Sequence, residues 1–280
     1  MKFVIWFIMI LGLAVVIIVT ASYSFQSKVK AEVKELFRDY GGPQYSIVSQ
    51  EDLHGLPAPV QRWLKRSNVI GKEMVKTVRL TQAGQMRTSA DQAWMPFTAQ
   101  QYFNVEKPGF IWYARINPAP LVHIAGRDKY YEGQGHMLIK IMSLANVANA
   151  SGKEMNQGAL VRYLAETIWY PAAALSEYIQ WETIDENSAR ATMEYEGTKA
   201  SGVFTFDLEG NVISFTAKRF REVKGQYTLD DWFVRAGDYK EFGGIRIPSR
   251  GIVKWQLPEG DFEWLQVEIT NLEYNKPYYF

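Results

Sequence analysis

The chain begins with an apolar segment that constrains its fold more than any other feature. Phe3 to Val19 contains no charged or strongly polar side chain, and Thr20 and Ala21 follow it. At about 1.5 Å per residue, a helix over residues 3–21 reaches the hydrocarbon thickness of a bilayer, about 30 Å. The sequence therefore predicts a transmembrane anchor over residues 1–22, which contacts the membrane through residues 3–21.

A cleaved signal peptide is the alternative interpretation of this segment. Signal peptides share its short basic start and apolar run, and Val19-Thr20-Ala21 would supply a small-residue cleavage site. The run is longer than the ~7–15 apolar residues that are usual in signal peptides. Its length therefore favours an uncleaved anchor.

The charges on either side of the anchor bear on its orientation. Lys2 precedes the anchor, whereas four basic residues lie between Lys28 and Arg38. A count of basic residues would place the C-terminal domain inside the cell. However, Ser22 to Ser27 carries no charge, and large domains often translocate regardless of nearby charge. We therefore expect the domain to be extracytoplasmic.

The composition excludes several classes of partner. Lys and Arg number 31 against 30 Asp and Glu, so the chain lacks the basic field on which nucleic-acid binding depends. We expect no nucleic-acid partner. The chain also contains no cysteine, which excludes disulfides and thiolate metal sites.

A second helical pattern follows the anchor. Over residues 27–40 apolar side chains recur on one helical face, which predicts a stalk helix that continues from the anchor. Gly41-Gly42-Pro43 should end this helix. We assign residues 23–50 to the stalk and a linker, and residues 51–280 to one curved-sheet domain.

A double-proline motif carries a family resemblance. Leu56-Pro57-Ala58-Pro59-Val60-Gln61-Arg62-Trp63-Leu64 starts a short helix, which Ser67-Asn68-Val69-Ile70-Gly71 ends. Together with Tyr163-Leu164-Ala165-Glu166 and Trp169-Tyr170-Pro171, these residues resemble a family of uncharacterised bacterial proteins, many with an N-terminal membrane segment. That family has no assigned activity, so the resemblance implies no catalytic residue.

Most of the remaining sequence alternates with a period of two. From Met74 to Ala148 and from Ala189 to Tyr274, runs of aromatic and β-branched residues predict antiparallel meanders. A helical segment from Asn156 to about Tyr178 separates them, and Pro171 should kink or divide it. The expected turns include Gly126-Arg127-Asp128, Glu209-Gly210-Asn211 and Pro258-Glu259-Gly260-Asp261.

The order of these elements predicts an α+β fold. We expect a strongly curved antiparallel β-sheet, a half-barrel, with helices on its concave side and the transmembrane helix at the N-terminus. This order resembles that of the bacterial lipoprotein carriers of the LolA type over roughly Met74 to Tyr274, and the resemblance implies an apolar cavity plugged by helices. Its short local motifs are Asp207-Leu208-Glu209-Gly210, Asp238-Tyr239 and Gly244-Ile245-Arg246-Ile247-Pro248.

Patterns for catalysis or metal binding are weak. His123, Asp128 and His136 could form a metal site, but no short-spaced ligand pair accompanies them. The chain has no Gly-x-Ser-x-Gly motif and no cysteine nucleophile. We expect no metal, no cofactor and no catalytic residue, while a hydrolase that uses His123 or Glu166 is the alternative.

The aromatic residues, 14% of the chain, indicate a binding site instead. A sheet of about ten strands with bulky inward faces tends to curl, and a small barrel can hold one apolar ligand. On the mid-chain helix Arg162 and Glu166 are four residues apart and can pair. The residues predicted to bind the ligand are Tyr163, Glu166, Trp169, Tyr170, Trp112 and Trp232.

The predicted function is that of a membrane-tethered, non-catalytic protein that binds a membrane lipid or another apolar or lipidated molecule. A structural or interaction module with a packed core is the remaining alternative.

Overall fold

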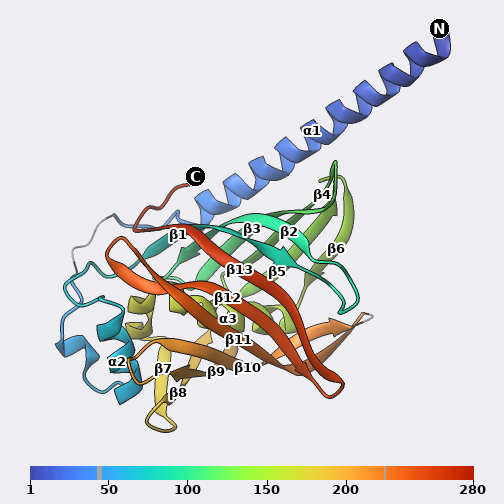
Figure 1. Cartoon of the computed structure of the whole chain (residues 1–280). Helices are drawn as coiled ribbons and strands as arrows, with labels where there is room; N and C mark the ends of the chain where they lie inside the picture. The colour runs from blue at the N-terminus through green and yellow to red at the C-terminus, as the bar shows by residue number, and fades with distance from the viewer. Residues whose placement is uncertain (43–45, 224) are drawn as a thin grey trace.

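A 13-stranded antiparallel sheet organises the molecule (Figure 1). The computed structural model describes residues 1–42, 46–223 and 225–280. The strand order is β6-β5-β4-β3-β2-β1-β13-β12-β11-β10-β9-β8-β7, so the first and last strands of the chain pair at the centre and the sheet ends at β6 and β7. The predicted half-barrel of two meanders is confirmed.

The strands are β1 (Thr77–Met86), β2 (Met95–Asn104), β3 (Gly109–Ala119), β4 (Val122–Tyr131), β5 (Gln134–Ile141), β6 (Ala145–Ser151), β7 (Ile179–Thr183), β8 (Ser188–Tyr195), β9 (Thr198–Phe206), β10 (Val212–Val223), β11 (Gln226–Phe242), β12 (Ile245–Leu257) and β13 (Gly260–Tyr274). The helices are α1 (Lys2–Leu36), α2 (Ala58–Arg66) and α3 (Lys153–Glu166), with short 3₁₀ turns η1 (Glu51–Leu53), η2 (Thr167–Trp169) and η3 (Pro171–Leu175).

The sheet curls until its two halves touch at one end. The β4–β5 turn meets the β8–β9 turn, where a Cβ added to Gly133 would lie 2.5 Å from the Cβ of Glu196. Beside this contact the rings of Tyr130 and Tyr195 lie 6.4 Å apart. Register shifts in the β1–β13 and β12–β13 pairs add local twist. The closure places the inward faces of distant strands opposite one another.

Helices cover both faces of the sheet. α3 crosses the concave face, where it contacts β5, β9 and β10. The C-terminal part of α1 packs on the convex face against alternate residues of β2 to β5, whereas its N-terminal part projects away from the sheet (Figure 1). The sheet therefore has one core on each side.

α1 is one continuous helix of 35 residues, long and apolar enough to cross a membrane. Its C-terminal part buries Phe25, Val29 and Val33, and the helix runs without a break from the apolar segment into these residues. The helix ends at Leu36, a turn before the predicted end at Tyr40. The reason is a cap from the sheet, since the Nδ2 of Asn104 donates to the carbonyl of Leu36 at 2.9 Å. Pro43, part of the predicted stop signal, lies outside the described residues.

One predicted turn is wrong. Gly126-Arg127-Asp128 lies in the middle of β4 and pairs with both β3 and β5. Its turn-like composition is outweighed by this pairing and by the ion pair of Arg127 with Glu32 of α1, Nε to Oε2 at 3.2 Å. The turns at Glu209 and Pro258 are confirmed, and Pro171 does divide the helical segment, since it begins η3. The sequence analysis missed the short edge strand β7.

Candidate functional site

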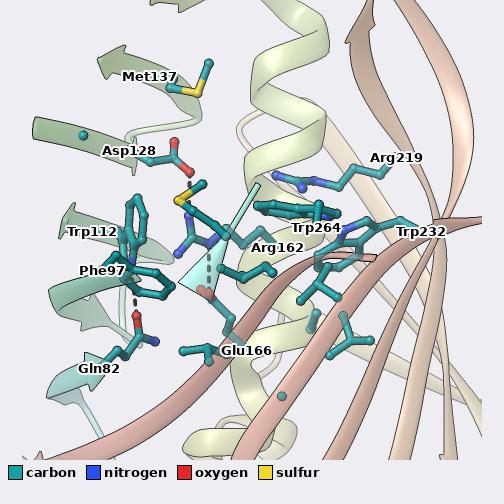
Figure 2. A pocket seen from close by; sticks show the side chains of 18 of the residues that line it. Gln82, Phe97, Trp112, Asp128, Met137, Arg162, Glu166, Arg219, Trp232 and Trp264 are labelled. Atoms are coloured by element: carbon teal, nitrogen blue, oxygen red, sulfur yellow. Dashed lines mark hydrogen bonds and ion pairs between the residues drawn. The ribbon is translucent and has the colours of Figure 1, made fainter. Parts of the chain in front are cut away.

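A cavity of about 280 Å³ lies between α3 and the concave face of the sheet. Its volume is close to the lower end of the ~300–1,000 Å³ typical of small-molecule sites. Strands β1 to β5 supply one wall, strands β10 to β13 the opposite wall, and α3 and η2 lie between them. Figure 2 shows Phe97 and Trp112 on one side of the cavity, with Trp232 and Arg219 on the other. Eight of the remaining lining residues are aliphatic and two are methionines.

A charged cluster lies beside α3 in the cavity wall. The Nη1 of Arg162 donates to Oδ2 of Asp128 at 2.7 Å, and its Nε donates to Oε1 of Glu166 at 2.8 Å. The guanidinium also lies over the ring of Trp112, 5.1 Å from its centroid. Since Arg162 and Glu166 lie one turn apart on α3, the helix presents both to the same face. Asp128 joins them because β4 runs straight through the predicted turn.

A chain of hydrogen bonds links this cluster to the aromatic wall. Oε2 of Glu166 accepts a hydrogen bond from Nε2 of Gln101 at 2.8 Å, and Oε1 of Gln101 accepts one from Nε2 of Gln82 at 3.2 Å. Oε1 of Gln82 in turn accepts from the indole Nε1 of Trp112 at 2.8 Å. The network therefore fixes the orientation of the Trp112 ring in the wall.

Burial changes the acidity of Glu166. Loss of water around its carboxyl group raises its pKa above the ordinary value of 4.5, and the positive charge of Arg162 opposes that rise. Arg162 thus favours the ionised form of the Glu166 carboxyl group inside the protein.

The opposite wall holds a second arginine. The Nε of Arg219 in β10 donates to the carbonyl of Gly158 at 2.9 Å. A Cβ added to Gly158 would lie 3.6 Å from that same Nε, an ordinary contact, so α3 and β10 pack directly against each other here. The guanidinium of Arg219 lies 4.8 Å from the centroid of Trp232.

Four of the six predicted ligand-binding residues line the cavity: Trp112, Glu166, Trp169 and Trp232. Tyr163 and Tyr170 do not line it; they pack against Phe103 in the core between the helix and the sheet. Tyr163 follows the cavity residue Arg162 by one position on α3, which turns its side chain by about 100° around the helix axis. Tyr170 follows Trp169 but lies outside the helices, with its backbone at φ −140° and ψ 70°. These two tyrosines therefore support the wall without facing the cavity.

The sequence analysis missed several polar wall residues. Gln82 and Gln101 sit on strands with no neighbouring signal that distinguishes them from surface glutamines. Arg219 carried a usable signal, because it occupies the same face of β10 as the buried Phe215 and Ala217. The alternation of side chains along β10 would therefore have predicted that Arg219 faces the concave side of the sheet.

The histidines lie away from this cavity. His123 contacts Ser143 and Ser22 of α1, and His136 contacts Arg127, all on the convex side. Asp128 faces the concave side, because successive residues of a strand point to opposite faces. Among the described residues, no group of three His, Cys, Asp or Glu side chains is placed to hold a metal ion.

Comparison with known proteins gives one family match. The model of a family of unknown function, DUF6544, matches residues 46–267. No curated protein matches the chain.

Three solved structures share a distant likeness. A LolA superfamily protein from Nitrosomonas europaea is 13% identical, with a TM-score of 0.41, over 78% of this chain and 94% of that one. A DUF1329 family protein from Desulfovibrio piger is 11% identical, with a TM-score of 0.41, over 78% and 92%. A β-barrel-like DUF1849 protein from Brucella abortus is 7% identical, with a TM-score of 0.29, over 72% and 99%. These values indicate nothing about a ligand.

Proposed function

The chain belongs to the DUF6544 family, and we propose that it is a membrane-tethered, non-catalytic protein that binds a lipid or another apolar molecule in the cavity beside α3. The observation that carries the proposal is the aromatic-lined cavity itself, about 280 Å³ in volume, in an otherwise well-filled core. A structural module with a packed core would have filled this space, because protein interiors pack to the density of organic crystals. Trp112, Glu166, Trp169 and Trp232 are the residues that would contact the ligand.

The hydrolase alternative gains no support from the geometry. Both oxygens of Glu166 already accept a hydrogen bond, from Arg162 and from Gln101, and the positive charge of Arg162 opposes proton uptake by this carboxylate. His123 lies on the convex side and cannot assist it. A general base must reach the proton that it abstracts.

α1 tethers the domain in this proposal, and the domain lies outside the cytoplasm. Support comes from the exposed apolar side chains of residues 3–19, continuous with a helical part that is docked on the sheet. Protease added to right-side-out vesicles should digest the domain, whereas inverted vesicles should protect it. The reverse pattern would contradict the orientation. A mature N-terminus near Ser22, read by mass spectrometry, would instead identify a cleaved signal peptide.

Filling the cavity should abolish ligand binding without unfolding the protein. A Cβ added to Gly126 would lie 3.7 Å from Trp112 and 4.0 Å from Ile116, both ordinary contacts, so Gly126→Val adds methyl groups to the cavity wall without forcing it apart. We expect the affinity for the uncharged probe N-phenyl-1-naphthylamine to fall by about tenfold or more, measured by fluorescence titration. The melting temperature should not fall.

Gly237→Val is the matched control, since a Cβ at this glycine of β11 meets nothing within 4 Å. It should bind the probe like the unmodified protein. Equal probe binding by both variants, or no binding by the unmodified protein, would contradict the proposed function.

A further inference from the structure

Arg219 is a cation in the cavity wall that pairs with no carboxylate of the described residues. Within the part of the chain that the structure describes, its one hydrogen bond runs from Nε to the carbonyl of Gly158, and it takes part in no ion pair. Arginine carries five N–H donors, so the four on its terminal nitrogens remain available. By contrast, Arg162 pairs with two carboxylates and Arg221, two residues along β10, pairs with Asp230 at 2.8 Å.

Two indole donors line the same cavity without an acceptor. Among the described residues, Nε1 of Trp232 and Nε1 of Trp264 are buried and have no hydrogen-bond partner. Trp232 is 4% exposed, so bulk water does not compensate for the missing bond. Figure 2 shows both rings grouped with Arg219 on one side of the cavity. This side of the cavity thus offers only donors to a ligand.

Charge balance decides which ligand group these donors suit. A neutral carbonyl could accept from an indole, but an anion also balances the positive charge of the half-buried Arg219 guanidinium. Burial lowers the pKa of Arg219 to about 10, so it remains protonated at neutral pH. Oδ1 of Asp128 is an unpaired acceptor in the same cavity. Its carboxylate already has a cation, because Arg162 binds the other oxygen at 2.7 Å.

We infer that the ligand of this cavity is an acidic amphiphile, whose carboxylate or phosphate oxygens bind Arg219 while its hydrocarbon part occupies the aromatic cavity. The inference rests on the proposed function and names the class of ligand for the same site. Trp232 and Trp264 donate the remaining hydrogen bonds to the anionic group.

Four ligands with eight carbons each test the inference: octanoic acid, octyl phosphate, octanol and octylamine. Each is titrated into the full-length protein, held in amphipol, against bound N-phenyl-1-naphthylamine. Octanoic acid or octyl phosphate should bind about tenfold to a hundredfold tighter than octanol, since a charged hydrogen-bonded contact is involved. The tighter of the two acids distinguishes a fatty acid from a phosphate head group. Octylamine should bind most weakly.

Arg219→Met should remove the preference for the acids and leave the affinity for octanol unchanged. Arg219→Lys keeps the charge and should retain part of the preference, which separates loss of charge from loss of the contact with Gly158. Arg221→Met is the matched control, because it removes one positive charge from the same strand outside the cavity lining. It should keep the full preference.

Two results would overturn the inference while leaving the proposed function intact: equal affinity for all four ligands, or a preference for acids that survives in Arg219→Met with an unchanged melting temperature. A preference for octylamine would also overturn it, and would point to Asp128 as the binding group. Failure of all four ligands to displace the bound probe would overturn the inference alone, whereas failure of the probe itself to bind would overturn the proposed function, and the inference with it.

Discussion

Replacing Arg162 with methionine should lower the free energy of unfolding by about 3–5 kcal/mol, because it leaves two buried carboxylates without a cation. The side chains of Asp128 and Glu166 are 14% and 11% exposed, and each bonds directly to Arg162. Methionine keeps most of the apolar stem, so the loss reports on charge more than on packing. Urea denaturation followed by tryptophan fluorescence measures the difference.

The pH dependence of this loss identifies its cause. The pKa of Glu166 is raised above 4.5 by burial, and removal of Arg162 raises it further. A carboxyl group with a raised pKa binds its proton more tightly in the folded state, so stability is present below the unfolded pKa and is lost as the pH rises through the folded pKa. The loss of unfolding free energy in Arg162→Met should therefore be largest near neutral pH and should become smaller as the pH falls toward 4.5. A deficit that is constant with pH would mean lost packing instead.

Two further variants act as controls for the charge argument. Adding Asp128→Asn and Glu166→Gln to Arg162→Met should recover part of the stability, since the buried charges are then gone. Arg190→Met breaks an exposed ion pair with Glu182 and should have little effect. If Arg190→Met matched the loss in Arg162→Met, burial would not be the reason for the effect.

Replacing Trp63 with alanine should cost a similar amount, about 3–5 kcal/mol, for an unrelated reason. Trp63 of α2 is fully buried, and its ring lies 5.9 Å from Phe204, 6.0 Å from Phe206 and 6.2 Å from Trp181. Truncation removes this ring from a cluster that holds α2 against β7 to β9. Urea denaturation followed by tryptophan fluorescence measures the loss of unfolding free energy. Trp63→Phe should lose less stability than Trp63→Ala because it retains one aromatic ring.

Ligand binding separates this stability effect from a change in the cavity. Trp63 does not line the cavity, so the folded fraction of Trp63→Ala should bind N-phenyl-1-naphthylamine with unchanged affinity. Leu208→Ala is the control for stability. Leu208 is 82% exposed at the β9–β10 turn, so its truncation should change the free energy of unfolding little. A Trp63→Ala protein as stable as Leu208→Ala would refute the packing role of α2.

Local periodicity made much of the fold predictable. The apolar run from Phe3 to Val19 predicted the start of α1, because an apolar segment of this length and composition is typical of a helix long enough to cross a membrane. Alternation with a period of two identified the strands of both meanders, because each strand has one face toward a core. Pro171 divided the helical segment for a purely local reason, its missing N–H donor.

The cavity depended on contacts that no local pattern contains. Arg162 and Glu166 could be paired from their spacing, but Asp128 joined them only because β4 continues through a sequence typical of a turn. Gln82 and Gln101 became part of a network through the pairing of β1 with β2 and the position of α3 above them.

The sequence by itself therefore determined the apolar N-terminal helix, the class of fold and the aromatic character of the strands, because each follows from neighbours within a few residues. Which side chains face one another across the cavity was decided only by the curl of the sheet. That curl brings Trp112 of β3 opposite Trp232 of β11, far apart in the chain, and gives Arg219 no carboxylate partner within the part of the chain that the structure describes. These contacts form only when the sheet curls and brings distant strands together. Interactions spread over the whole sheet contribute to the free energy that favours this curl, so no single segment of the sequence encodes it.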